Sequence, residues 1–202
     1  MYKLACILLD MRCNTIQLKV ENLSLHHTPT PNITRAYLLG ALHDSSEAKY
    51  TFRLCQKNLN YIELCAQGIK NLGFKCWVYK EGKDRDLYIA EFSKRVLYNF
   101  SINTPIEKID YIRGYFDSEG GIPRNFNSRY YIYFAQKNKE DLLALRSYLI
   151  DLRISCGNIH NPSKLVDPNY FRFYILRESW EKFGNLIGSY HPVKSIFVRK
   201  KI

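Results

Sequence analysis

Apolar and polar residues alternate in two stretches of the chain that share the same ending. Residues 50–58 ("YTFRLCQKN") and 130–138 ("YYIYFAQKN") both begin with tyrosine and close on Gln-Lys-Asn. A period of two residues is typical of a β-strand that buries one face, so each stretch predicts a strand. The shared ending indicates an internal repeat.

The second of these strands follows a segment with strong helix signals. Thr104 can cap the helix, Pro105 suits its first position, and Glu107 completes a capping box. We expect the helix to run to about Ser118 and to stop at the glycine pair 120–121 with a left-handed backbone.

The first strand follows a similar segment, which predicts a helix from about Pro31 to Ser45 without a glycine stop. Gly40 and Gly114 lie within the two helices, where glycine costs about 1 kcal/mol relative to alanine. They therefore predict a close backbone approach, most simply between the two helices themselves. Their acidic ends would then lie together at the negative ends of both helix dipoles, a setting that suits a divalent cation.

Further elements repeat after each strand: an amphipathic helix, a pair of short strands and another helix. They are predicted at 60–74, 75–80, 86–92 and 93–101, and again at 139–154, 155–160, 170–176 and 178–188. The pattern predicts an α+β fold of two duplicated units, 31–103 and 104–202, related by a pseudo-two-fold axis. Each unit has the order helix, strand, strand or loop, helix, strand, strand, helix (αββαββα). We expect a flexible basic tail at 199–201. Residues 1–30 form an extension, either a strand added to the body or an arm along a ligand.

Composition narrows the class of partner. The 202 residues include 30 Lys and Arg against 19 Asp and Glu, and the net charge of +11 favours a polyanion, nucleic acid first. The sequence contains no uninterrupted run of about eighteen apolar residues, so no membrane-spanning helix is predicted. The six cysteines show no C-x-x-C pair, which favours free thiols in a reducing intracellular compartment; an organelle and an archaeal or bacterial cytoplasm both remain open.

Within the glycine helices, "IRGYFDSEG" (112–120) and "LLGALHDSS" (38–46) resemble the nine-residue motif of the LAGLIDADG homing endonucleases in their monomeric two-motif form. In the second motif Gly114 holds the third position, Asp117 the sixth and Glu119 the eighth, where the family places its metal-binding acid. In the first motif Gly40 holds the third position, but the eighth falls on Ser45.

The resemblance implies two antiparallel saddle-shaped sheets along the DNA major groove, with the motif helices packed between them. It implies a site-specific endonuclease that hydrolyses double-stranded DNA at a long target site with Mg²⁺ or Mn²⁺. The protein would act as a monomer without an obligate protein partner. Polar and basic residues would flank the scissile phosphates: Gln56, Lys57, Gln136 and Lys137. A carboxylate, a metal ion and a nearby cation are the set that phosphodiester hydrolysis needs.

The sequence does not decide which residue of the first motif region supplies the second carboxylate. Asp44 is our choice as the partner of Glu119, since a one-residue slip at the helix end brings it to the site; Glu47 is the reserve, and Ser45 offers only a neutral ligand. We expect His43 to be packed or hydrogen-bonded rather than metal-bound. Because the first motif has Ser45 where the family has an acid, three other functions stay open: a nickase, a DNA-binding protein without cleavage, and an RNA-binding intron maturase.

Strand alternation separates inward from outward side chains. Inward positions are predicted at Tyr50, Phe52, Leu54, Tyr130, Ile132, Phe134, Phe171, Phe173 and Ile175. Basic and aromatic residues dominate the outward positions, where they can reach phosphates and base edges. The predicted DNA-binding residues are Lys49, Thr51, Arg53, Arg129, Tyr131, Tyr133, Arg172 and Tyr174.

Overall fold

The computed structural model describes residues 31–200 except 83–84, 124 and 126, and the side chains of Asp44, Arg199 and Lys200 are also outside the description. The predictions for the extension 1–30 and for Lys201 therefore lie outside the described residues. Residues 31–202 form one compact unit. Among the described residues, no helix is both long and apolar enough to cross a membrane.

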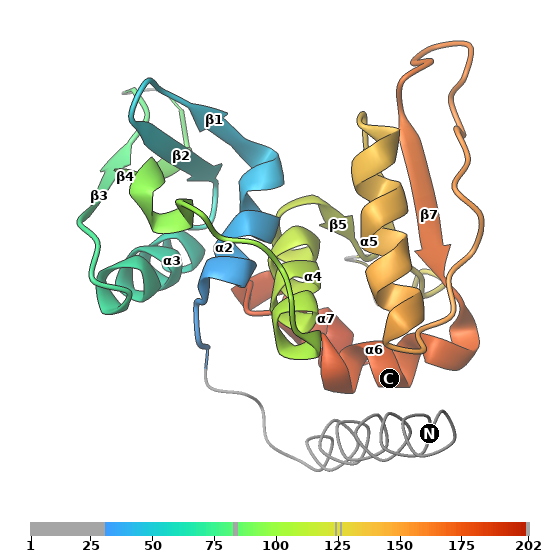
Figure 1. The fold of residues 1–202 in the computed structure, drawn as a ribbon. Helices are drawn as coiled ribbons and strands as arrows, with labels where there is room; N and C mark the ends of the chain where they lie inside the picture. The colour runs from blue at the N-terminus through green and yellow to red at the C-terminus, as the bar shows by residue number, and fades with distance from the viewer. Residues whose placement is uncertain (1–30, 83–84, 124, 126, 201–202) are drawn as a thin grey trace, which may run out of the picture. The chain divides into compact units, whose positions relative to one another are not determined.

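The described elements follow the predicted repeat (Figure 1). The first half contains α2 (Arg35–Ala41), η1 (Leu42–Asp44), β1 (Ser45–Glu47), β2 (Thr51–Gln56), α3 (Leu59–Asn71), β3 (Cys76–Lys80), β4 (Tyr88–Ser93) and η2 (Lys94–Leu97). The second half contains α4 (Pro105–Glu119), β5 (Gly120–Gly121), β6 (Ile132–Gln136), α5 (Lys139–Asp151), β7 (Phe171–Ile175), η3 (Arg177–Ser179), α6 (Trp180–Leu186) and α7 (Pro192–Lys200).

Both sheets are antiparallel, as predicted. The first has the strand order β1-β2-β4-β3 and the second β5-β6-β7. In Figure 1, α2 and α4 lie side by side between the two sheets. The α+β fold class expected from the sequence is therefore confirmed.

The start of α4 is the one predicted, but its end is different. The Thr104 hydroxyl accepts from the Glu107 amide at 3.2 Å, and the Glu107 carboxylate accepts from the Thr104 amide at 2.8 Å. Gly120, however, is extended (φ −70°, ψ 145°) rather than left-handed. A Cβ at Gly120 would overlap Phe116, and one at Gly121 would overlap the Tyr133 ring, so this glycine pair permits close packing rather than a left-handed turn.

The first motif helix is shorter than predicted. It begins at Arg35 instead of Pro31, because the Thr34 hydroxyl caps it by accepting from the Tyr37 amide at 3.1 Å. It ends at Ala41, and the 3₁₀ turn η1 continues the chain to Asp44. Ser45, predicted as the last helical residue, is the first residue of β1.

The predicted strand 155–160 is replaced by two isolated bridges to β7, Cys156 with Ile175 and His160 with Arg172. The Gly157 amide donates to Tyr174, and the His160 amide donates to Arg172. Three steps along one segment thus match two steps along β7, and this additional residue interrupts the ladder as a β-bulge does.

Two helix-related predictions are also corrected. The predicted helix 93–101 is only the single 3₁₀ turn η2, and the chain turns at Asn99, whose φ is +52°. The predicted flexible tail is wrong for Arg199 and Lys200, because both belong to α7.

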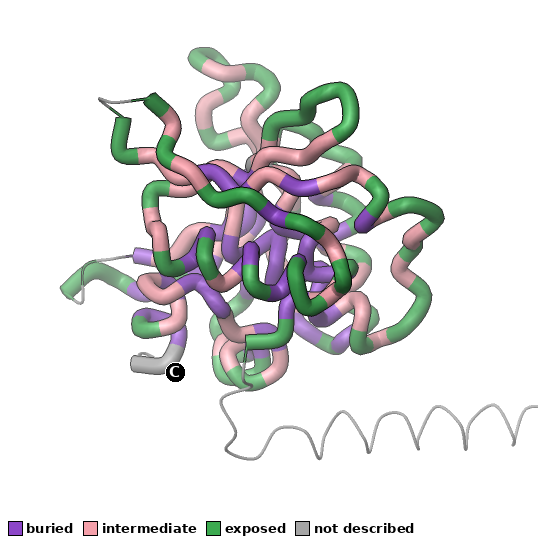
Figure 2. Tube along the Cα trace, turned by 90° about the vertical axis from the view of Figure 1, so that its left-hand side faces the viewer, coloured by how far each residue is buried: buried purple, intermediate pink, exposed green. Residues whose placement is uncertain are grey.

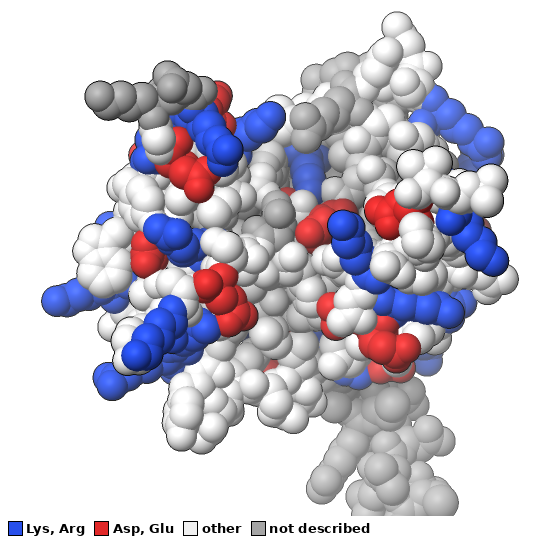
Figure 3. Space-filling model, turned by 90° about the horizontal axis from the view of Figure 1, so that it is seen from above, with Lys and Arg blue, Asp and Glu red and all other residues white. Residues whose placement is uncertain are grey.

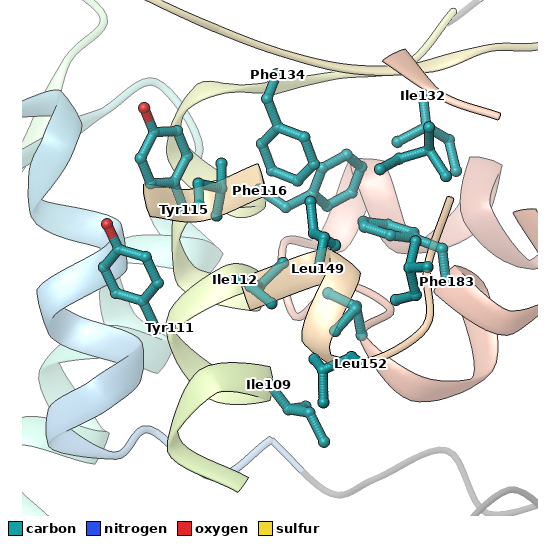
Figure 4. Packing of buried hydrophobic residues seen from close by; sticks show 14 of the residues in the cluster. Ile109, Tyr111, Ile112, Tyr115, Phe116, Ile132, Phe134, Leu149, Leu152 and Phe183 are labelled. Atoms are coloured by element: carbon teal, nitrogen blue, oxygen red, sulfur yellow. The ribbon is translucent and has the colours of Figure 1, made fainter. Parts of the chain in front are cut away.

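Each half has its own hydrophobic core, and the motif helices connect the two. Ala36 of α2 belongs to the core of the second half, whereas Tyr190 belongs to that of the first. Figure 2 shows the buried residues gathered toward the interior of residues 31–202. In Figure 4, Ile109 and Ile112 lie on one side of α4, and Tyr111 and Tyr115 lie on the other.

Most strand faces agree with the predicted alternation, with two differences. Tyr50 precedes β2 and is 71% exposed instead of inward. Ala135 is buried, although the alternation that places Phe134 inward predicts an outward position for it. Of the cysteines, the four that the structure describes carry free thiols: Cys55, Cys65, Cys76 and Cys156. Burial raises the pKa of the Cys76 thiol to about 11 and that of Cys156 to about 12, so both are protonated at neutral pH.

Candidate functional site

The two motif helices cross at their glycines. A Cβ on Gly40 would overlap the backbone carbonyl of Tyr111, and a Cβ on Gly114 would overlap that of Tyr37. Because each glycine faces the backbone of the other helix, the helices approach as closely as their main chains allow. The predicted contact between the two helices is present.

A second pair of contacts joins the helices symmetrically. The Tyr37 hydroxyl donates to Asp117 at 2.6 Å, and the Tyr111 hydroxyl lies 2.8 Å from Nε2 of His43. Each tyrosine precedes its own motif glycine by three residues and meets the sixth-position residue of the opposite motif. The sequence analysis does not identify this pair; the available signal was a tyrosine immediately before each motif, Tyr37 and Tyr111.

Asp117 has a structural role in the interior. Its side chain is 1% exposed and accepts from Tyr37, from the Ser189 hydroxyl and from the Tyr190 amide at 2.9 Å. Burial raises the pKa of Asp117, while these hydrogen bonds and the nearby Lys194 oppose that shift. The sixth motif position therefore contributes to packing between α4 and the C-terminal segment rather than to a solvent-facing site.

A buried lysine holds the C-terminal end of α4. Nζ of Lys194, in α7, donates to the carbonyls of Phe116 and Gly120 at 2.7 Å, of Asp117 at 2.9 Å and of Ser118 at 3.4 Å. A cation at this position offsets the negative end of the helix dipole. The acidic helix ends are predicted to suit a divalent cation, and at the end of α4 the protein also supplies a cation of its own, Lys194.

Strand register brings Glu119 and Gln136 to the same end of α4. Glu119, the last residue of α4, is half-buried. It directly precedes β5, and Gly120 of β5 pairs with Phe134, two residues before Gln136 at the end of β6. Lys137 follows as an exposed residue.

Strand register shows how the first motif compares. Gln56 and Gln136 end the two matching strands, so Leu54 and Phe134 are equivalent positions. Leu54 pairs with Ser45, and Phe134 pairs with Gly120. The residue immediately before β1 is Asp44, just as Glu119 immediately precedes β5.

The 3₁₀ turn η1 accounts for this one-residue slip. Between the crossing region and the strand, the first motif has the three residues Leu42–Asp44 in a 3₁₀ turn, and the second has four α-helical residues, 116–119. A 3₁₀ turn rises about 2.0 Å per residue and an α-helix about 1.5 Å, so both segments span roughly 6 Å. The backbone thus brings Asp44, rather than Ser45, to the place that Glu119 holds in the other half.

The other two candidates of the first motif are engaged elsewhere. The Ser45 hydroxyl donates to the Leu42 carbonyl at 2.5 Å. Glu47 forms an ion pair with Lys94 at 2.6 Å.

Gln56 and Lys57 line a cleft of about 510 Å³ together with His191 and Val193 of the C-terminal segment.

The described side chains do not by themselves make up a complete metal site. The part of the chain that the structure describes has no group of three or more His, Cys, Asp or Glu side chains that could hold a metal. Mg²⁺ in enzymes is commonly held by one or two carboxylates together with substrate phosphates and water. Glu119, at the C-terminal end of α4, is a half-buried carboxylate of the kind that such a site uses.

The outward faces of both sheets carry the predicted polar and aromatic residues. On the second sheet Tyr133 lies 5.8 Å from Tyr131 and 6.1 Å from Tyr174 between ring centroids, and the Arg172 guanidinium lies 5.3 Å from the Tyr174 ring. Arg129 is exposed beside them. Figure 3 shows Lys and Arg side chains on both sides of the face seen from above, with acidic side chains among them.

On the first sheet, Thr51 and Arg53 both contact Glu91 of β4. Lys49 precedes the strand, and its Nζ lies 5.0 Å from the centroid of the Tyr50 ring. Glu91 and Tyr79 were not among the predicted site residues. Arg53 on β2 was predicted to bind DNA, but the strand order β2-β4-β3, which brings Glu91 and Tyr79 to the same sheet face as Arg53, cannot be read from one sequence.

His43 gives the motif helices a pH-dependent contact. Its Nδ1 lies 3.6 Å from Asp141, and burial lowers the pKa of His43 although Asp141 opposes the shift. The unfolded chain therefore binds a proton more readily, so the free energy of unfolding should fall as the pH drops below about 6.5, down to the folded pKa. His43→Gln should lack this loss. Urea denaturation of both proteins at pH 7.5 and 5.5 tests it, and an equal change in both would contradict the prediction.

Comparisons with known proteins agree with this geometry. Residues 107–188 match the LAGLIDADG-like domain. The homing endonuclease I-DmoI in complex with DNA and Ca superposes with a TM-score of 0.62 and 21% identity, covering 80% of this chain and 94% of that one. Its complex with DNA and Mn gives a TM-score of 0.58 and 22% identity, covering 76% and 94%.

Two other proteins are similar. Full-length DUF199/WhiA from Thermatoga maritima gives a TM-score of 0.61 at 18% identity, covering 88% of this chain and 62% of that one. The uncharacterized protein MJ0314 of Methanocaldococcus jannaschii is 25% identical over 169 residues, which span 72% of this chain and 64% of the relative.

The described part of the chain therefore has a LAGLIDADG fold, similar to that of I-DmoI and of DUF199/WhiA, and residues 107–188 match the LAGLIDADG-like domain. The resemblance predicted from the two motifs is confirmed.

Proposed function

We propose that the protein is a site-specific endonuclease that cleaves double-stranded DNA with Mg²⁺ or Mn²⁺. The observation that carries the proposal is the matched register of the two motifs. Glu119 ends the motif helix α4, Asp44 ends the 3₁₀ turn η1 that follows the motif helix α2, and each residue directly precedes the first strand of a sheet. Both motifs come from one chain, so a monomer supplies both carboxylates.

The chemistry follows from the residues around each carboxylate. A divalent ion bound there would activate water and stabilise the leaving oxygen. Glu119 and Asp44 would hold that ion, while Gln136 and Gln56 would orient phosphate oxygens. The exposed amines of Lys137 and Lys57 would offset the charge that develops on the phosphate.

The sheets supply the DNA-binding surface in this proposal. Their outward residues combine arginine with tyrosine, and the net charge of +11 adds attraction for the phosphate backbone. The I-DmoI structures with DNA and Mn or Ca support a comparable use of the fold here.

A second candidate is a nickase. Its support is the difference between the motifs: aspartate is one methylene shorter than glutamate, and a 3₁₀ turn presents Asp44 where an α-helical turn presents Glu119. Two unequal sites would cleave the two strands at different rates.

One experiment separates these functions. Randomised duplex DNA is first selected for binding to the protein in Ca²⁺, and a supercoiled plasmid carrying the selected sequence is then incubated with Mg²⁺. Linear product supports the endonuclease, and nicked circles that persist support the nickase. Retained binding with intact plasmid would refute cleavage and leave a DNA-binding protein. Absence of any selected DNA, with binding to structured RNA, would favour a maturase.

A further inference from the structure

Glu91 lies at the centre of a hydrogen-bonded cluster on the outward face of the first sheet. Its Oε2 accepts from the Tyr79 hydroxyl at 2.5 Å and from Nε of Arg53 at 3.3 Å, and its Oε1 accepts from the Thr51 hydroxyl at 2.7 Å. These residues come from three neighbouring strands, with Arg53 and Glu91 directly paired. The carboxylate therefore fixes an arginine across the sheet.

The cluster uses only one edge of the guanidinium. Nε and Nη2 of Arg53 donate to the Tyr79 hydroxyl at 3.2 and 3.0 Å. Five N–H donors are present on an arginine, so both donors of Nη1 and one of Nη2 remain for a ligand. The Arg53 side chain is 42% exposed and that of Glu91 is 23%, which places the arginine nearer to solvent than its anchor.

Glu91 is a charged anchor at neutral pH. Hydrogen bonds from Tyr79 and Thr51 lower the pKa of Glu91, and Arg53 lowers it further. A carboxylate beside Arg53 weakens the attraction of that arginine for phosphate, which depends on net charge. It leaves the directional donors intact, and paired donors of arginine match O6 and N7 of guanine in the major groove.

We propose that Glu91 and Tyr79 are positioning residues that hold Arg53 to read one guanine of the target DNA. The cluster fixes the arginine before DNA arrives, so less side-chain entropy is lost on binding. It also suppresses binding of the same side chain to phosphates of any sequence. This inference rests on the DNA binding in the proposed function, not on cleavage.

The test uses the full chain and the DNA selected in Ca²⁺. Each base pair of the selected site is substituted singly, and the position at which Arg53→Ala loses its guanine preference is identified. We expect the wild type to favour guanine there by about tenfold or more. Glu91→Gln and Tyr79→Phe should both reduce that preference to about threefold or less and leave the other positions unchanged.

The two variants differ in charge, which separates positioning from folding. Glu91→Gln should bind non-target DNA more tightly, with a salt dependence steeper by about one phosphate contact, because Arg53 becomes available to phosphates. Tyr79→Phe should leave that slope unchanged. Glu63→Gln, an exposed residue on α3, makes the same charge change away from this sheet face and should retain the full guanine preference.

Retained guanine preference in both Glu91→Gln and Tyr79→Phe would overturn the inference while the proposed DNA binding stands. No guanine preference that depends on Arg53 would overturn it as well. If no duplex DNA is selected at all, the proposed function fails first. Far-ultraviolet circular dichroism of each variant shows that a lost preference reflects recognition and not unfolding.

Discussion

Glu119→Gln is expected to yield no linear product from the target plasmid, because cleavage of at least one strand is lost. In the proposed function Glu119 holds the metal ion, so its removal should forfeit several kcal/mol of transition-state stabilisation, on the order of a 10³-fold slower cleavage. Glutamine keeps the size of the side chain, so binding to target DNA in Ca²⁺ should persist. Gel analysis of supercoiled, nicked and linear plasmid measures the result.

Asp44→Asn provides the matched variant in the first motif. If the register identifies the second carboxylate correctly, strand-specific end labels should show that the two variants impair cleavage of opposite strands more strongly. Ser45→Ala should cleave like the wild type. Full double-strand cleavage by Glu119→Gln would refute its assignment, and a severe defect in Ser45→Ala with normal Asp44→Asn would refute the slip.

Gly114→Ala, which adds one methyl group at the crossing of the two motif helices, should strongly lower the free energy of unfolding. The new methyl group would overlap the Tyr37 carbonyl, a backbone atom that cannot move unless the two helices separate. Alanine is favoured over glycine in a helix by about 1 kcal/mol, so the overlap must exceed that gain. We expect a net loss of about 3 kcal/mol or more, a large part of the stability of a typical domain.

Urea denaturation measures this loss, with Gly157→Ala as the control. At Gly157 the nearest atom to an added Cβ is 3.6 Å away, which is an ordinary contact. The control should change the free energy of unfolding by about 0.5 kcal/mol or less. Equal stability of the two variants would show that the crossing tolerates a wider separation than the structure has. Gly40→Ala, which meets the Tyr111 carbonyl, should behave like Gly114→Ala.

Local chemistry made some elements predictable. The start of α4 follows from neighbouring residues, Thr104, Pro105 and Glu107, which act on each other within one turn. The alternation in 132–136 likewise indicates its buried face, because Ile132 and Phe134 alternate with less apolar positions. By contrast, the sequence predicts the first motif helix from about Pro31, whereas α2 begins at Arg35 with Thr34 as its cap.

The site depended on partners that are distant in the sequence. Lys194 meets the end of α4 from more than seventy residues away, and Tyr37 finds Asp117 only because the helices cross. The alternation of apolar and polar residues along the chain does not indicate such long-range pairings. The β-bulge between 157 and 160 was missed for a similar reason, since a bulge is defined by the partner strand as much as by its own residues.

The 3₁₀ turn η1 shows that the two motifs have the same reach with different residue counts. What the halves share is a length along the helix axis between the glycine contact and the acid. A comparison that numbers positions from the glycine finds serine where it seeks a carboxylate, whereas one that measures the path finds Asp44. The first motif has one residue fewer than the second, and the narrower 3₁₀ winding of its backbone makes up the missing length. The position of the acid is therefore better described by its distance along the helix axis than by its number in the motif.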